Sequence, residues 1–194
     1  MTVAGLLLAA GAGTRFGRPK ALVELGGETL VARGVRLLTD GGCSPVVVVL
    51  GAWADRVQDA VPLPGVVVAA DWETGMGASL RAGLQALEAQ GATACVVALA
   101  DQPLVGPEAV ARLLAAHERG AVAAVATYDG QPRNPVLLAR STWAEVAAGA
   151  TGDAGARHWL RTHPEQVTAV PCDDAGTPFD IDTPEDLAHL EAPA

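Results

Sequence analysis

A short run of apolar residues at the start of the chain, Val3 to Leu8, leads directly into a glycine-rich loop. An apolar run without polar alternation predicts a strand that is buried on both faces, as in a parallel sheet. Gly11, Gly13 and Gly17 allow the loop backbone to approach a ligand closely, and exposed amides at such a turn bind anions. The cations of the loop are Arg15, Arg18 and Lys20, the only lysine of the chain. Together these features predict a polyphosphate site at the end of a buried strand.

Two common phosphate-binding loops do not match this sequence. The dinucleotide fingerprint G-x-G-x-x-G requires its third glycine one residue before Gly17, where Phe16 stands. The P-loop requires Gly-Lys followed by Ser or Thr, whereas Pro19 precedes Lys20 and Ala21 follows it. A nicotinamide-dependent oxidoreductase is therefore a poor match. A structural turn with unrelated cations is the plainer alternative.

The pattern G-x-G-T-R-x-G-x-P-K after an apolar strand resembles the nucleotidyltransferase superfamily that activates sugars, polyols and pterins with nucleoside triphosphates. Within it, the segment LAAGAGTRFGRPK is similar to the MobA-like group, and most of all to the molybdenum cofactor cytidylyltransferases. The resemblance implies that the loop wraps around the triphosphate and that Arg15 and Lys20 neutralise phosphate charge during catalysis. The loop residues that it assigns to nucleotide binding, mainly through their backbone, are Ala9, Ala10, Gly11, Ala12, Gly13 and Lys20.

Apolar runs alternate with helical patterns along the chain, which has 194 residues, of which 50% are hydrophobic. This rhythm predicts an α/β fold with a mostly parallel sheet and helices on both faces. The resemblance adds a Rossmann-like, three-layer α/β/α architecture of the nucleotide-diphospho-sugar transferase type, with residues 1–194 as a single domain. Strands are expected over residues 3–8, 46–50, 66–70, 94–100, 122–127, 135–138 and 167–170. Helices are expected over residues 28–39, 53–61, 78–89, 108–119, 141–147, 153–161 and 183–190.

The composition argues against several classes of function. The formal net charge of −9 argues against nucleic acid as a partner, because non-specific binding requires a cationic surface. The sequence has neither a run of about 20 apolar residues nor the pattern of a signal peptide, so we expect a cytoplasmic protein without a membrane partner. Its three cysteines are widely spaced and form no C-x-x-C pair, which does not fit a disulfide framework or a zinc cluster.

Asp101 follows the apolar run Ala94 to Ala100, at the expected carboxyl end of a central parallel strand. Ligands bind over such strand ends, and Mg²⁺ prefers one or two carboxylates together with phosphate oxygens and water. A turn or helix-cap role before Pro103 is the alternative. Through the motif A-D-x-P, the resemblance implies that Asp101 contacts the nucleotide and serves in catalysis as a magnesium ligand.

The segment FDIDTPEDL near the C-terminus offers a second pair of carboxylates, Asp180 and Asp182. An extended backbone points both side chains to the same side. Residues 183–186 also fit an ordinary helix start, with Thr183 or Asp182 as its cap. By resemblance, Asp182 is the second magnesium ligand and a catalytic residue, and Asp180 has a supporting role.

Residues 71–84, with the sequence DWETGMGASLRAGL, follow the third expected strand. Gly75 and Gly77 give the next helix a flexible beginning, and Ser79 lies in its first turn. Small residues are also common at helix starts for purely structural reasons, which is the alternative explanation of this segment. In the family that the sequence resembles, the matching loop recognises the base and the ribose, which implies nucleotide-binding roles for Gly75, Met76 and Ser79.

Two further loops, YDGQPRNPVLL over residues 128–138 and TGDAGARHWL over residues 151–160, are similar to the acceptor-side loops of the family. They make Asn134, Asp153 and Arg157 the candidates for binding the acceptor. Cofactor-transferring relatives often carry histidine at the position of Asn134. This difference affects the expected identity of the acceptor more than the expected reaction. A helix cap is the alternative role for Asp153, and a solvated helix side chain is the alternative for Arg157.

These expectations combine into a magnesium-dependent nucleotidyltransferase. A phosphate monoester on the acceptor, with a second pKa of about 6, is mostly ionised at neutral pH and needs no general base. Such transfer depends mainly on positioning and charge neutralisation. The expected substrates are CTP and molybdopterin, with a molybdenum hydroxylase apoenzyme as a partner that receives the product. The alternatives are GTP with the same acceptor, a sugar or polyol phosphate, and a non-catalytic accessory protein that hands the cofactor to the hydroxylase.

Overall fold

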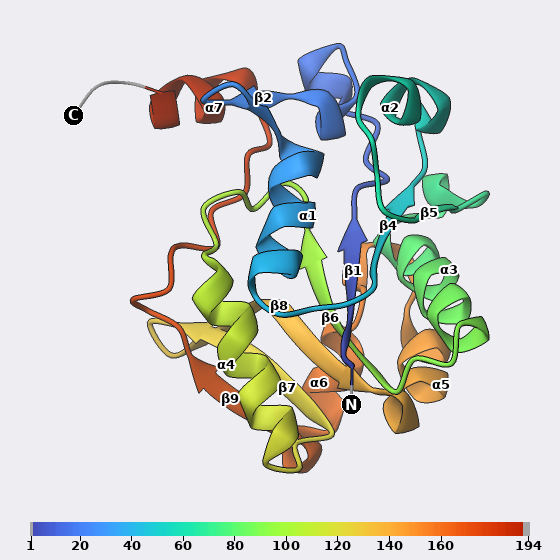
Figure 1. Cartoon of the computed structure of the whole chain (residues 1–194), viewed down its shortest axis with the longest axis vertical. Helices are drawn as coiled ribbons and strands as arrows, with labels where there is room; N and C mark the ends of the chain where they lie inside the picture. The colour runs from blue at the N-terminus through green and yellow to red at the C-terminus, as the bar shows by residue number, and fades with distance from the viewer. Residues whose placement is uncertain (1, 192–194) are drawn as a thin grey trace.

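The computed structural model describes residues 2–191, and within them a seven-stranded sheet carries helices on both of its faces (Figure 1). The strands lie in the order β5-β4-β1-β6-β8-β7-β9. β8 is antiparallel to both of its neighbours, and the other neighbouring strands are parallel. The strands of this sheet are β1 (Ala4–Leu8), β4 (Val46–Leu50), β5 (Val66–Val68), β6 (Ala94–Leu99), β7 (Ala123–Tyr128), β8 (Gln131–Ala139) and β9 (Val167–Pro171).

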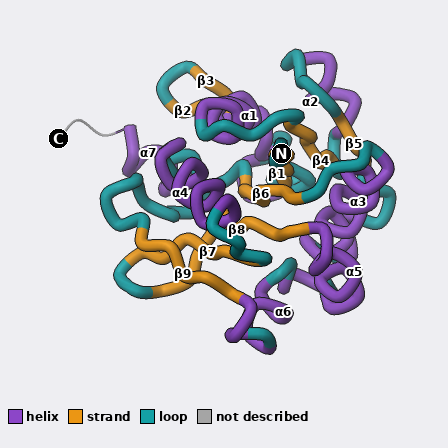
Figure 2. The backbone as a smooth tube through the Cα atoms, turned by 60° about the horizontal axis from the view of Figure 1, so that its bottom comes forward, coloured by secondary structure: helices purple, strands orange, loops and turns teal. Residues whose placement is uncertain are grey.

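Side chains alternate between the two faces of the sheet, as β1 shows. Leu7 packs into a hydrophobic cluster with Leu113, whereas Leu6 packs into a separate cluster with Leu80. Figure 2 shows the helices of these clusters, α4 and α3, on opposite sides of the strands. The helices are α1 (Leu30–Asp40), α2 (Ala54–Ala60), α3 (Met76–Ala89), α4 (Pro107–Glu118), α5 (Arg140–Gly149), α6 (Arg157–Thr162) and α7 (Pro184–Glu191). The predicted three-layer α/β/α fold with a mostly parallel sheet is thus confirmed, and no helix within residues 2–191 is long and apolar enough to cross a membrane.

A small third cluster joins the C-terminal segment to the region that follows the glycine loop. β2 (Glu24–Leu25) and β3 (Glu28–Thr29) form a short hairpin that lies beside α7 (Figure 1). The amide of Gly26 in its turn donates to Oε1 of Glu191 at 3.5 Å. The buried members of the cluster are Val23, Leu25, Leu30 and Ile181. This packing places the segment around Ile181 beside residues 23–30, which follow the glycine loop.

The elements differ from the sequence predictions mainly at their ends. The helix expected from residue 28 begins at Leu30, because the preceding two residues pair in the hairpin and the Thr29 side chain caps the helix through the amide of Ala32. The helix expected over residues 153–161 is divided into a 3-10 turn (Gly152–Ala154) and α6, since Gly155 between them has a φ of 51°. The strand expected over residues 135–138 is the nine-residue β8.

β1, β4 and β6 are neighbours and run in parallel, so their carboxyl ends lie at one edge of the sheet, the upper one in Figure 1. The glycine loop follows β1, and Trp53 and Asp101 follow β4 and β6. Because ligands of open α/β sheets bind outside these strand ends, the predicted nucleotide site is expected at this edge.

Candidate active site

Lys20 lies between two carboxylates that are distant in the sequence. Its Nζ atom is 2.8 Å from Oδ2 of Asp101 and 2.7 Å from Oδ1 of Asp182. The Lys20 side chain is 16% exposed, whereas those of Asp101 and Asp182 are 28% and 53% exposed. Burial alone lowers the pKa of Lys20, but attraction and hydrogen bonds from the two aspartates outweigh it and raise the pKa above its usual value. Three of the residues predicted to be catalytic therefore form one ion-pair cluster.

Hydrogen bonds to the backbone hold the two aspartates in place. The carbonyl of Asp101 accepts from the amide of Ile181 at 2.9 Å, and Ile181 itself is fully buried. Oδ2 of Asp186 accepts from the amides of Asp182 and Thr183 at 2.9 and 2.8 Å. Oγ1 of Thr183 accepts from the amide of Asp186 in return, which is a capping box at the start of α7. The amide of Asp182 and the groups of Thr183 lower the pKa of Asp186. The helix-cap role thus holds for residues 183–186, and the same cap fixes Asp182.

Asp180 lies next to this cluster but pairs with a different side chain. Its Oδ1 accepts from Nε2 of Gln102 at 2.9 Å, and Gln102 is only 5% exposed. Burial raises the pKa of Asp180, and the charges of Asp101 and Asp182 raise it further against the opposing effects of Gln102 and Lys20. Gln102 directly follows Asp101, but no pattern in the sequence indicates a role for its side chain. Asp180 and Asp182 are thus held by different partners.

A cavity of about 320 Å³, which we call the inner cavity, lies beside this cluster and gathers residues from four separate segments. The residues predicted to bind the nucleotide that line it are Ala10, Gly11, Gly75, Met76, Ser79 and Asp101. Asp153, one of the acceptor candidates, also lines it. The remaining lining residues are Leu8, Trp72, Glu73 and Leu99. The glycine loop, the start of α3 and the end of β6 therefore meet around one space.

Close packing at the start of α3 explains why residue 75 is a glycine. Gly75 has a φ of 111°, and a Cβ atom there would lie 2.5 Å from the carbonyl carbon of Gly152. Oδ1 of Asp153 accepts from the amide of Met76 at 3.4 Å and so caps the helix from a distant loop. Asp153 therefore caps α3 and not the helix expected over residues 153–161, and it also lies in the wall of the inner cavity.

Arg81, a residue of α3, holds the chain around Ala150 against this helix. The sequence did not indicate this role. Nη1 of Arg81 donates to the carbonyl of Ala150, and its Nη2 donates to Oδ2 of Asp71 at 3.0 Å. A Cβ atom on Gly77 would lie 2.6 Å from the carbonyl oxygen of Ala150. These contacts fix the wall of the inner cavity that carries Asp153.

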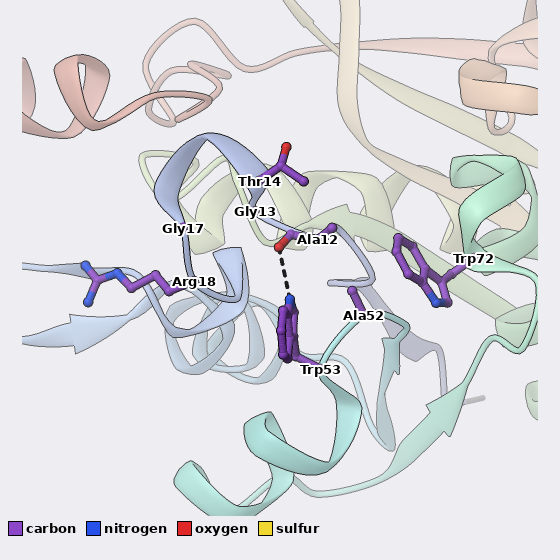
Figure 3. Close-up of a pocket in the computed structure, with 8 residues that line it drawn as sticks. All are labelled: Ala12, Gly13, Thr14, Gly17, Arg18, Ala52, Trp53 and Trp72. Carbon is purple, nitrogen blue, oxygen red and sulfur yellow. Dashed lines mark hydrogen bonds between the residues drawn. The ribbon is translucent and has the colours of Figure 1, made fainter.

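A second cavity, of about 350 Å³ and here called the outer cavity, is bordered by the later part of the glycine loop (Figure 3). Trp53 is 51% exposed and has a φ of 62°, and its Nε1 donates to the carbonyl of Ala12 at 3.3 Å. The guanidinium of Arg56 lies 5.3 Å from the centre of the Trp53 ring. Trp72 borders both cavities. The lining residues are Ala12, Gly13, Thr14, Gly17, Arg18, Ala52, Trp53 and Trp72. The predicted nucleotide ligands Ala12 and Gly13 thus face this cavity and not the inner one.

Part of the glycine-loop backbone serves the fold itself. Ala9 is buried, and its amide donates to the carbonyl of Val49 at 2.9 Å. Gly13 has a φ of 63°, and a Cβ atom there would collide with the carbonyl of Arg18 and lie 2.6 Å from the amide nitrogen of Lys20. Gly13 is therefore required for the loop to fold back and place Lys20, a role that differs from the ligand approach expected from the sequence.

Three other predicted residues lie outside the lining of both cavities. Arg15 is exposed on a 3-10 turn (Thr14–Phe16), and Arg157 is exposed at the first position of α6. Asn134 is half-buried in β8. The catalytic role of Arg15 and the acceptor-binding roles of Asn134 and Arg157 stay predictions.

The ion-pair cluster fits a magnesium ion. Asp101 and Asp182 direct carboxylate oxygens to one point, and the ammonium of Lys20 is the cation that stands there. Within the described residues no group of three or more His, Cys, Asp or Glu side chains could hold a metal by itself. Two carboxylates suit Mg²⁺, which takes its other ligands from phosphate oxygens and water.

Comparisons with known proteins agree with this geometry. Residues 5–167 match the family model of the MobA-like NTP transferase domain. The chain is 41% identical to nicotine blue oxidoreductase of Paenarthrobacter nicotinovorans, over 97% of this chain and 96% of the relative. It is 35% identical to molybdenum cofactor guanylyltransferase of Rhodobacter capsulatus, over 98% of this chain and 96% of the relative.

Solved structures show the same fold. Rv0371c from Mycobacterium tuberculosis H37Rv superimposes with a TM-score of 0.85 and 29% identity, covering 98% of each chain. Its complex with manganese superimposes with a TM-score of 0.82 and 27% identity, again over 98% of each chain. The similarity thus extends over nearly the full length of the chain, including the C-terminal segment with Asp182.

Proposed function

The chain belongs to the MobA-like NTP transferase family, and from this premise we propose that it transfers a nucleoside monophosphate from a nucleoside triphosphate to a phosphorylated acceptor. The observation that carries the proposal is the cluster of Lys20, Asp101 and Asp182 beside the inner cavity. A triphosphate with its metal ion needs both a cation and carboxylates at one place. A protein that only bound a cofactor would not require this pairing.

In the proposed reaction, an ionised phosphate oxygen of the acceptor attacks the α-phosphorus in line. A new P–O bond forms as the bond to the β-phosphate oxygen breaks, and pyrophosphate leaves with the electron pair. Lys20 and Arg15 offset the negative charge that accumulates on the phosphates. A magnesium ion, held by Asp101 and Asp182, supplies further neutralisation when it is bound. No general base is needed, because the acceptor phosphate is already ionised.

The inner cavity is the proposed place of the nucleotide. Ala10 and Gly11 border it from the glycine loop and Ser79 from the first turns of α3, as the family resemblance predicts for contacts to base and ribose. Asp153 borders the same cavity from a further segment of the chain, which supports a place for the acceptor on that side. The donor phosphates would then lie between the glycine loop and Asp101.

We propose CTP as the first donor to test and molybdopterin as the acceptor. GTP follows directly, since the Rhodobacter capsulatus relative is named a molybdenum cofactor guanylyltransferase. A molybdenum hydroxylase apoenzyme is the proposed recipient of the product. The single domain over residues 1–194, the cytoplasmic location and the lack of nucleic-acid and membrane partners stay predictions from the sequence.

The test is a panel of the four nucleoside triphosphates with molybdopterin and Mg²⁺, followed by pyrophosphate release. We expect release with one triphosphate, loss of release in Asp101→Asn, and retention in Asp40→Asn, a matched change at the exposed end of α1. Absence of release with every triphosphate contradicts the proposal. Nucleotide binding without release would instead support the accessory-protein alternative.

The name of the Paenarthrobacter nicotinovorans relative supports a second candidate, an oxidoreductase. The aromatic walls that Trp53 and Trp72 give the outer cavity suit a flat aromatic compound. Against it, the loop lacks the dinucleotide fingerprint because Gly17 comes one residue late. Oxidation of a reduced nicotinamide in the presence of nicotine blue, without pyrophosphate release in the panel above, would favour this candidate.

A further inference from the structure

The ammonium of Lys20 occupies the place that the proposed reaction assigns to a divalent cation. It contacts Oδ2 of Asp101 and Oδ1 of Asp182, the two groups proposed as metal ligands. We propose that Lys20 keeps free divalent metal out of the site, so that the metal is accepted only together with a triphosphate. This inference rests on the proposed function and gives Lys20 a role in selecting what enters, beyond neutralising phosphate.

The two aspartates come from different parts of the chain and repel each other. Asp101 follows β6, whereas Asp182 precedes α7. A cation between them offsets that repulsion, and Lys20, whose side chain is 16% exposed, provides it without any ligand. The carboxylates are therefore already in place before a metal arrives.

The same arrangement makes the metal and the ammonium competitors. Lys20 must leave at least one of the two carboxylates before those oxygens can bind a divalent ion. A largely buried ammonium that loses its partners is strongly unfavourable unless another anion receives it. A triphosphate is such an anion, and the glycine loop that carries Lys20 borders both cavities through its other residues. Displacement of Lys20 is thus favourable only when the triphosphate is present.

The side chain itself is suited to such an exchange. Lysine has a compact ammonium on a flexible stem, whereas the planar fork of arginine favours fixed two-point pairing with one carboxylate. Lys20 is the only lysine of the chain, and the other 12 cations are arginines. The Nζ atom of Lys20 is also a unique spectroscopic probe, because no other side chain contributes an amine of this type.

Thermodynamic linkage predicts how the metal and the triphosphate affect each other's binding affinity. If Lys20 must move for either ligand to bind well, metal and triphosphate strengthen each other's binding by the same factor. Replacing Lys20 with a neutral side chain removes the competing cation. The variant then binds metal more tightly without triphosphate, and adding the triphosphate strengthens that binding less than in the natural protein.

The experiment measures binding of Mn²⁺ by electron paramagnetic resonance, with and without inorganic tripolyphosphate as the probe. For the natural protein we expect weak binding of Mn²⁺ alone and a gain of about 5- to 150-fold with tripolyphosphate, the usual range of such coupling. Lys20→Met and Lys20→Gln should bind Mn²⁺ alone more tightly by a factor in the same range. Arg133→Gln, the same charge change on an exposed residue of β8, should match the natural protein.

Equal or weaker binding of Mn²⁺ by both Lys20 variants, with their fold verified by circular dichroism, overturns the inference. The single Nζ resonance of ¹⁵N-lysine-labelled natural protein gives a second readout that needs no variant. It should shift when Mg²⁺ and tripolyphosphate are added together and stay unchanged with Mg²⁺ alone, and a full shift with Mg²⁺ alone overturns the inference as well. If no triphosphate gives pyrophosphate release but Mn²⁺ binding and the Nζ shift behave as expected, the transferase function is rejected. The proposal that Lys20 excludes free metal is then still supported.

Discussion

Asp182 follows Lys20 by 162 positions, yet its carboxylate oxygen lies 2.7 Å from the Lys20 ammonium. Lys20 is placed by the loop after β1, and Asp182 by the cap of α7. The small cluster around Ile181 packs the two segments against each other. The position of the C-terminal segment therefore completes the candidate site.

Replacement of Lys20 with alanine should lower the rate of nucleotidyl transfer sharply. A preorganised charge that stabilises the transition state contributes about 10²- to 10³-fold to kcat, and we expect a loss of that size. Pyrophosphate release under saturating triphosphate measures it. Arg36→Ala, the loss of an exposed cation of α1, should leave the rate unchanged. An unchanged rate in Lys20→Ala would refute the catalytic role.

Removal of the Asp186 carboxylate should lower the metal affinity and the activity, although Asp186 has no proposed contact with the substrate. Asp186→Ala loses the hydrogen bonds to the amides of Asp182 and Thr183, so Asp182 is held less firmly. Groups that orient a metal ligand contribute about 10- to 100-fold to activity or metal affinity, and a loss in this range is expected. Asp186→Asn keeps an acceptor oxygen and should restore most of it. Similar losses in both variants, measured as Mn²⁺ affinity and kcat, would argue against positioning through the cap.

Two glycines of the loop with the same φ of 63° should respond differently to alanine. A Cβ atom on Gly17 meets nothing within 4 Å, so Gly17→Ala bears only the left-handed backbone cost of about 1–2 kcal/mol. Gly13→Ala adds a collision with the carbonyl of Arg18 and should cost clearly more. Urea unfolding of the two variants measures the difference. Equal destabilisation would show that the loop relaxes at no cost.

The stability that Asp180→Asn adds to the natural protein should depend on pH. The pKa of Asp180 is raised in the folded state, so the folded protein holds this proton more readily than the unfolded chain. Its contribution to stability therefore declines as the pH rises through the folded pKa. The variant removes that decline while keeping an acceptor for Gln102, and should melt at a higher temperature at pH 7.

The same reasoning predicts that the advantage of Asp180→Asn shrinks as the pH falls below about 4, where the carboxyl is protonated in both states. Melting temperatures across this range, without divalent metal, test the sign. A variant that melts lower than the natural protein at pH 7 would indicate that the charge of Asp180 stabilises the fold.

The sequence alone was enough to predict which segments lie at the carboxyl ends of the strands. Apolar runs located the strands, and the glycine loop after β1 and Asp101 after β6 had to lie at one edge because these neighbouring strands are parallel. Lys20 comes well after Leu8, the last residue of β1, so its contact with Asp101 depends on how the loop folds back at Gly13, and their joint role was predicted from the family resemblance. The nearness of Asp182 followed only from the family resemblance, since its segment has no regular structure to place it.

Other features have no local pattern that predicts them. The β2–β3 hairpin consists of two-residue strands, too short for any periodicity, and its Gly26-Gly27 turn was the only signal. The contact of Arg81 with Ala150 joins residues far apart in the chain. The partner of Asp180 is a glutamine that becomes significant only once the fold has buried it.

The most direct test of the account is a crystal structure with Mn²⁺ and a non-hydrolysable analogue of the triphosphate that the panel identifies. We predict an anomalous peak for the metal between the carboxylates of Asp101 and Asp182, with the Lys20 ammonium moved onto the phosphates. A nucleotide bound elsewhere, with Lys20 still paired to both aspartates, would contradict it.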